Sequence, residues 1–131
     1  MASSSVSTTI AGQLSTRRDV MTVTSSSGNN VVAVDTTATN LDQVIVDNTA
    51  GTAAIFVRIW DLATGSVSLG APSTAPTFIL TAGIGESVEY SFAPAPVFHN
   101  ALSAQVTTSS GYADAGSATS WAATVTFLSH D

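Results

Sequence analysis

The stretch that decides the fold runs from Ala53 to Trp60 and reads AAIFVRIW. Successive side chains of a β-strand point to opposite faces, so Ile55, Val57 and Ile59 share one apolar face. Arg58 belongs to the opposite face, which we therefore expect to be at least partly exposed to solvent. The stretch predicts a strand that packs one side against a core.

Similar runs recur along the chain. Short segments rich in Val, Ile, Thr and Phe follow one another at spacings of roughly ten residues, separated by clusters of Gly, Asn, Asp, Ser and Pro, and no stretch is typical of a helix. This spacing predicts an all-β sandwich or barrel of about eight strands. The expected strands are Val20 to Thr24, Val31 to Asp35, Gln43 to Asp47, Ala53 to Trp60, Thr77 to Leu80, Ser87 to Phe92, Leu102 to Thr107 and Ala122 to Leu128.

Two polar clusters between these strands resemble hairpin turns. Residues 27–30 read SGNN and residues 47–51 read DNTAG, and Gly, Asn and Asp tolerate the positive φ of tight turns. The beginning of the chain differs, because it is rich in Ser and Thr with isolated Ile10 and Leu14. We expect an extended N-terminal arm over residues 1–18 and one β-sandwich domain over residues 19–131. The arm is expected either to order on a neighbouring subunit or to remain a disordered terminus.

Charged side chains are scarce. They make up 9% of the chain, against roughly 25% in soluble domains, and the three basic residues are all Arg. Lys side chains usually protect edge strands from pairing with other chains, and this chain has no Lys. A surface of Ser, Thr and Ala does little to repel a neighbouring subunit, so we expect it to lie against partner proteins. The alternative is a monomer kept in solution by hydroxyl groups and a net charge of −6.

The same composition excludes two classes of partner. Three Arg are too few to neutralise a nucleic-acid backbone, so no nucleic-acid partner is expected. No apolar run approaches the roughly 20 residues of a membrane helix, so no membrane partner is expected.

The sequence contains no pattern typical of an enzyme with a Ser or Cys nucleophile. The chain has no Cys, which excludes a thiolate nucleophile and a Cys-based zinc site. A serine hydrolase would need His99 or His130 as its base, and His130 is the penultimate residue, where chains fray. Residues 65–70, GSVSLG, do not have the Gly-x-Ser-x-Gly spacing of a nucleophile elbow.

The acidic residues give equally weak signals. Glu86 and Glu89 are expected on opposite faces of one strand, which does not suit a glycosidase pair. Asp35, Asp42 and Asp47 offer oxygen ligands for a hard cation, but their spacing matches no calcium loop. We therefore expect no enzyme, no metal site and no cofactor.

Two further segments match a recognisable pattern together with the decisive strand. That strand ends in an acid, FVRIWD at residues 56–61, and a loop containing Pro72 and Pro76 follows it. Residues 84–92 then read IGESVEYSF and residues 98–108 read FHNALSAQVTT. From about Val44 to Leu128 the chain resembles small virion proteins of tailed bacteriophages. The resemblance implies a jelly-roll-like β-sandwich that binds the capsid lattice as a trimer.

We therefore expect a capsid cement or decoration protein of the virion surface, made in the host cytoplasm, whose partners are the major capsid protein and copies of itself in a homotrimer. Candidate assembly contacts are Arg17, Arg18, Trp60 and Leu128. The N-terminal third does not align with the phage pattern, so the position in the virion stays open. The alternative is a receptor-binding or fibre-associated domain that stacks sugars on an aromatic residue, the candidates being Trp60, Trp121 and Tyr112.

Overall fold

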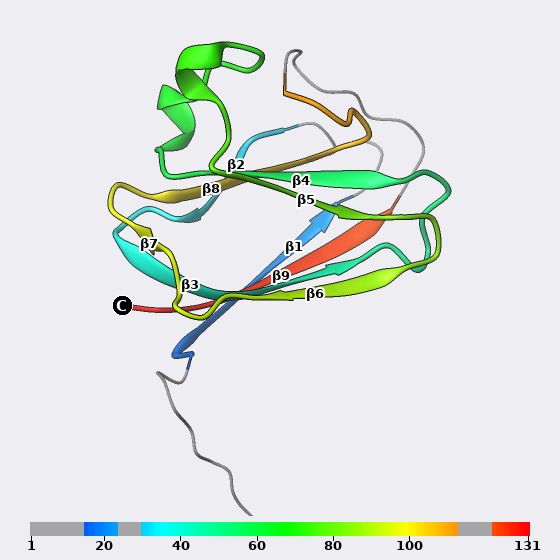
Figure 1. Ribbon diagram of the computed structural model, residues 1–131, viewed down its shortest axis with the longest axis horizontal. Helices are drawn as coiled ribbons and strands as arrows, with labels where there is room; N and C mark the ends of the chain where they lie inside the picture. Colours follow the sequence, from blue (N-terminus) through cyan, green and yellow to red (C-terminus); the bar gives the residue numbers. More distant parts are fainter. Residues whose placement is uncertain (1–14, 24–29, 113–121) are drawn as a thin grey trace, which may run out of the picture.

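Two antiparallel β-sheets face each other in the computed structural model, which describes residues 15–23, 30–112 and 122–131 (Figure 1). The first sheet has the order β1 (Arg17–Val23), β9 (Ala123–His130), β3 (Thr39–Asp47) and β6 (Ser87–Ser91), with β7 (Val97–Phe98) also paired to β3. The second has the order β2 (Val32–Asp35), β8 (Leu102–Thr107), β4 (Ile55–Trp60) and β5 (Phe78–Ala82). Two short 3-10 turns, η2 (Thr64–Ser66) and η3 (Pro72–Thr74), lie between β4 and β5.

The strand pairing is nested. β4 pairs with β5, β3 with β6, β2 with β8 and β1 with β9, and these pairs are divided between the two sheets. This is the arrangement of a double-sheet jelly roll. The expected all-β, jelly-roll-like sandwich is therefore confirmed. Within the described residues, no helix is long and apolar enough to cross a membrane.

The two expected hairpin turns are not hairpins. Residues 47–51 lie between β3 of the first sheet and β4 of the second, so this connection crosses from one sheet to the other. The cluster at residues 27–30 falls largely outside the described residues, but the strands on either side of it, β1 and β2, also belong to different sheets. Turn-forming residues mark where a strand ends, and they do not say which strand pairs with it.

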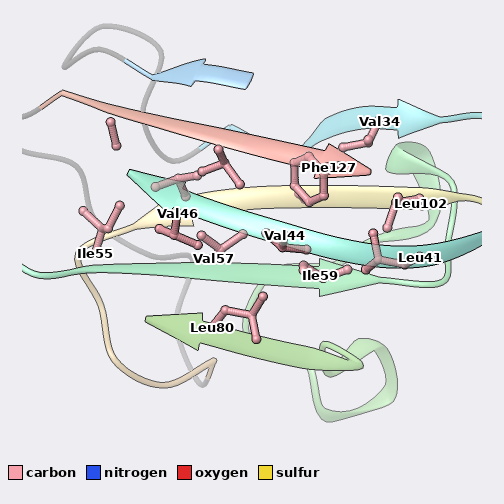
Figure 2. Close-up of a cluster of buried hydrophobic side chains, with 14 of the residues drawn as sticks. Val34, Leu41, Val44, Val46, Ile55, Val57, Ile59, Leu80, Leu102 and Phe127 are labelled. Atoms are coloured by element: carbon pink, nitrogen blue, oxygen red, sulfur yellow. The ribbon is translucent and has the colours of Figure 1, made fainter. Parts of the chain in front are cut away.

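The core lies between the sheets (Figure 2). Val44, Val46 and Phe127 reach it from the first sheet, and Val57 and Ile59 reach it from the second, all with no exposed surface. The alternation of side chains from Ala53 to Trp60 therefore predicts correctly that Ile55, Val57 and Ile59 face the core. Removal of these side chains from water is the main favourable contribution to folding.

Arg58 is buried, contrary to its expected exposure, although its neighbour Ile79 across the β4–β5 ladder is 39% exposed. Arg58 and Gln105 have no exposed surface, and the Arg58 guanidinium donates a hydrogen bond of 3.1 Å to the Gln105 side-chain oxygen. The loop after β4 folds back over part of the sheet face to which Arg58 belongs. Its Leu62 carbonyl accepts a hydrogen bond from Ser103 Oγ, and its Thr74 carbonyl accepts one from the indole of Trp60.

The expected boundary of the N-terminal arm also shifts. β1 begins at Arg17, and the backbone N–H of Thr16 already donates to the carbonyl of Ser129 at 2.9 Å. Ser15 Oγ donates to Asp42 Oδ2 at 2.8 Å. Residues 15–18 are therefore part of the sandwich, and only residues 1–14 remain as the expected arm, outside the described residues.

Candidate functional site

The two long sides of the sandwich are closed to different degrees. On the β5–β6 side, the hydroxyl of Tyr90 donates to the Thr81 carbonyl at 2.6 Å and accepts from the Thr81 N–H at 3.1 Å. The rings of Phe78 and Phe92 pack nearby, with centroids 5.3 Å apart. Hydrogen bonds and aromatic packing thus close this side.

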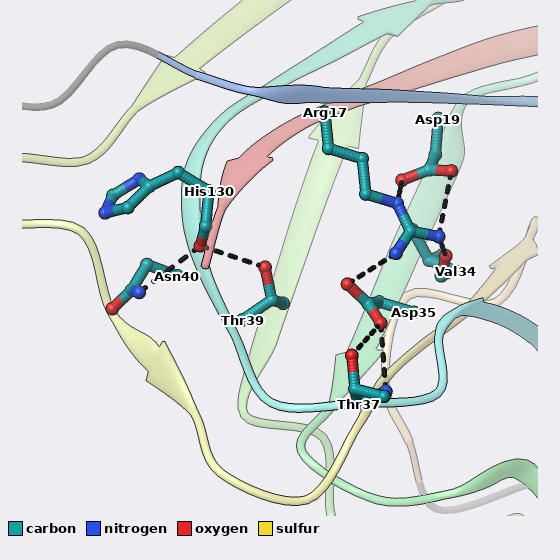
Figure 3. Close-up of polar contacts among 8 residues, drawn as sticks. All are labelled: Arg17, Asp19, Val34, Asp35, Thr37, Thr39, Asn40 and His130. Carbon is teal, nitrogen blue, oxygen red and sulfur yellow. Dashed lines mark hydrogen bonds and ion pairs between the residues drawn. The ribbon is translucent and has the colours of Figure 1, made fainter.

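On the β1–β2 side, one arginine joins the two sheets (Figure 3). Arg17 Nε lies 2.8 Å from Asp19 Oδ2, and Arg17 Nη1 lies 2.8 Å from Asp35 Oδ2 on the facing strand. Its Nη2 also donates to the Val34 carbonyl at 2.9 Å. The hydrogen bond to Asp19 is the main cause that raises the pKa of Arg17. Asp35 is 2% exposed, and its other oxygen accepts from the Thr37 N–H and hydroxyl.

Beyond this ion pair the β1–β2 side stays open. A groove of about 310 Å³ runs between the two edge strands and reaches the core at Phe127. Val20 and Val32 line it and are 46% and 39% exposed. The complete lining is Asp19, Val20, Met21, Thr22, Val32, Ala33, Val34 and Phe127. Because Asp19 is already paired with Arg17, the groove presents mainly apolar surface between two strands that, within the described residues, pair on one side only.

The expected assembly contacts are distributed unevenly around this groove. Arg17 makes intramolecular ion pairs while its side chain remains 43% exposed, whereas Trp60 is 2% exposed and offers little surface to a partner. Arg18 is exposed and lies opposite Leu128, which is half-buried, in the β1–β9 ladder. The structure thus brings Arg18 and Leu128 together beside the open edge.

A second polar site connects the end of β4 with the turn before β8. Asp61, at the end of the decisive strand, accepts hydrogen bonds from the backbone N–H groups of His99, Asn100 and Ala101 at 2.8 to 3.3 Å. Burial raises the pKa of Asp61, but these three hydrogen bonds outweigh it and the net pKa is lowered. Asp61 therefore positions the turn before β8, which is a structural role.

Comparisons of the chain with protein-family models, curated proteins and solved structures give no match. The site therefore has to be interpreted from its own geometry.

His130, Asp42 and Ser15 lie together, but not in the order of a catalytic triad. His130 lies in β9 and is 8% exposed, so it does not fray as expected; its backbone carbonyl accepts hydrogen bonds from Thr39 and Asn40 (Figure 3). Its Nδ1 is 2.8 Å from Asp42 Oδ1, and Ser15 Oγ bonds to the other oxygen of the same carboxylate. The carboxylate thus lies between the serine and the histidine, whereas nucleophile activation requires the serine to donate to the histidine.

The candidate carboxylates are likewise held apart. Glu86 Oε1 accepts from the Gly83 N–H in the turn before β6, whereas Glu89 Oε1 accepts from the Gln43 side chain. Asp47 bonds its own turn through Thr49, and the hydroxyl of Thr49 is the main cause that lowers the pKa of Asp47. Among the described residues, no three His, Cys, Asp or Glu side chains are grouped so that they could hold a metal ion.

Two contacts between the sheets, one on each long side of the sandwich, could not be found from the sequence. Charge pairing between Arg17 and Asp35 links residues in different sheets, and alternation alone does not say which strands face each other. The Tyr90 hydroxyl that closes the opposite side likewise connects strands of different sheets. The scarcity of charged residues is the one sequence signal for the ion pair of Arg17, because three arginines and nine carboxylates allow few possible ion pairs.

Proposed function

We propose that the chain is a structural component of a bacteriophage virion, acting as a capsid cement or decoration protein. The observation that carries the proposal is the open β1–β2 side, where an apolar groove and exposed valines lie between strand edges that Arg17 bridges only at one end. Exposed strand edges next to apolar surface favour protein association. A chain with 9% charged residues and no Lys has little to oppose such contacts.

The mechanism is adhesive. Copies of the chain bury strand edges and apolar side chains against each other and against the major capsid protein, so that opening a capsid contact also requires breaking these added ones. Jelly rolls recur in viral capsid proteins and in lectins, so the fold is compatible with this role and does not by itself favour it over binding a receptor.

The receptor-binding alternative loses its main aromatic candidate. The Trp60 ring is 2% exposed and its indole N–H is bonded to the Thr74 carbonyl, so the ring offers no face for a sugar. Trp121 lies outside the described residues. Tyr112 is half-buried, and no described feature beside it forms a sugar site.

The test compares phage particles with and without the protein. Particles lacking it are expected to release their nucleic acid at a lower temperature, and addition of the purified chain is expected to restore the wild-type release temperature. Electron microscopy of the restored particles locates the protein, with bovine serum albumin as the addition control. Equal thermal release from both kinds of particle, or density only on the tail, would rule out the cement role.

A further inference from the structure

Each of the two sheets has two outer edges. β1 forms one edge of the first sheet and β6 with the two-residue β7 forms the other, whereas β2 and β5 border the second sheet. Edge strands present unpaired N–H and C=O groups to other chains, and proteins hinder such pairing with bulges, charges or covering groups. Differences in this protection show which edge is available to a partner.

Three of the four edges are protected. β2 has four residues, and its register with β8 shifts between Ala33 and Asp35, which bends the edge. On β5, the Tyr90 hydroxyl occupies both backbone groups of Thr81. β6 has five residues with Glu89 at its centre, so two antiparallel copies in full overlap would place this carboxylate opposite itself.

β1 has neither a bulge nor a covering group, and its charges, Arg17, Arg18 and Asp19, occupy the first three positions of the strand instead of its centre. It has seven residues, pairs with β9 without a register shift, and contains neither Pro nor Lys. Its central residue is Val20, whose side chain is 46% exposed. It is therefore the longest edge strand of the described chain and has an apolar centre.

The charges of β1 also select one self-pairing register. When two antiparallel copies present the same face, full overlap places Val20 opposite Val20 of the second copy, Arg18 opposite Thr22 and Asp19 opposite Met21. A shift of about two residues toward the start of the strand would place Asp19 opposite itself, and a further equal shift would place Arg18 opposite itself. Shifts the other way shorten the ladder. Full overlap is thus the register that avoids like charges and keeps every pair.

We propose that β1 is a self-association edge, through which two copies of this chain pair antiparallel around a two-fold axis at Val20. The first sheets of the two copies then form one continuous sheet, and the exposed Val20 side chains of the two copies lie against each other. The contact requires only this chain, so it does not depend on the virion role. It would link pairs of chains in addition to any three-fold association.

A single-cysteine variant tests the axis directly. The chain has no Cys, so Val20→Cys introduces its only thiol, and a residue meets its own copy only on a two-fold axis. Opposite Cα atoms in antiparallel strands lie about 4.5–5.5 Å apart, which suits a disulfide. Under mild oxidation we expect V20C to become a covalent dimer. Ile79→Cys, at the 39% exposed Ile79 on the protected β5 edge, is the matched control and should remain uncrosslinked.

The mass in solution provides an independent readout. Size-exclusion chromatography with light scattering is expected to give a dimer for the wild type, a monomer for Val20→Lys and a dimer for Ile79→Lys, with circular dichroism confirming that each variant is folded. A wild-type monomer at tens of micromolar, or V20C that crosslinks no more than I79C, would overturn the proposal. Dimers that form only after deletion of residues 2–14 would also overturn it, because the edge of the full chain would then be occupied by its own N-terminal segment.

Discussion

Asn48 follows β3 directly, and its side chain has no exposed surface. Its Nδ2 donates to the carbonyls of Ala53 and Gly83, both at 2.9 Å, so one amide connects the β3–β4 crossing with the turn between β5 and β6. The sequence identifies this residue only as part of a turn. Its partner Gly83 is far along the chain, and that contact depends on the stacking of the two sheets.

The space beside Asn48 explains why residue 51 is glycine. A Cβ on Gly51 would lie 1.8 Å from Asn48 Oδ1, so Gly51→Ala must displace the buried amide and its hydrogen bonds. We expect a loss of about 1–3 kcal/mol in the free energy of unfolding. Urea denaturation measures it, with Gly65→Ala as the control, because no atom lies within 4 Å of a Cβ there. Equal stability of the two variants would contradict the expected clash.

Asp61 predicts a specific dependence of stability on pH. Its pKa in the folded chain is below the ordinary value of 3.8, so its contribution is fully present above that value and is lost as the pH falls through the folded pKa. Asp61→Asn should cost about 1–2 kcal/mol at neutral pH, because an amide does not replace a carboxylate that accepts three N–H groups. Denaturation curves at pH 7 and at several pH values below 3.8 should show the stability difference between the wild type and D61N narrowing as the pH falls. A difference that stays constant with pH would argue against this role.

At the scale of elements, the ion pair of Arg17 fastens β1 to β2. Arg17→Gln leaves the Asp35 carboxylate, 2% exposed, without its cation. Because the Arg17 side chain is 43% exposed, we expect a loss of about 1–3 kcal/mol, less than for a fully buried pair. Thermal or urea unfolding checks this. The neighbouring Arg18→Gln, with no ion pair among the described residues, should change stability by less than about 0.5 kcal/mol. Similar losses in both variants would contradict the assigned bridge.

Strand positions followed from the sequence far better than strand partners. The expected strand from Leu102 to Thr107 has the same first and last residues as β8, and each of the other expected strands overlaps an observed one. Periodicity is a local property of the chain, so it locates strands and their apolar faces. The two-residue β7 was missed because it is too short to alternate. The burial of Arg58 does not follow from alternation, which assigns a side chain to one face of a sheet without saying what covers that face.

At the scale of the whole molecule, the nested pairing brings the first and last strands together. β1 lies beside β9, so the described start of the chain is held by its last strand. The candidate site depends on this closure, since the open side lies between β1 and β2 and has Phe127 of β9 at its base. Sequence reasoning suggested the charge-poor surface and the arm, but not the open side, because a groove between two sheets exists only after both have formed.

The boundary between arm and sandwich gives the last prediction. Deletion of residues 2–14 should leave the free energy of unfolding unchanged within about 0.5 kcal/mol, because this Ser- and Thr-rich segment has no alternation of apolar residues that would fix it to a sheet. Deletion of residues 2–16 also removes the hydrogen bonds from Ser15 to Asp42 and from Thr16 to Ser129, and should cost about 1–2 kcal/mol. Urea denaturation separates the two truncations. If the shorter deletion also weakens incorporation into particles, its unchanged stability assigns that loss to contacts of the arm rather than to unfolding; if it destabilises the chain as much as the longer one, residues 1–14 belong to the sandwich itself.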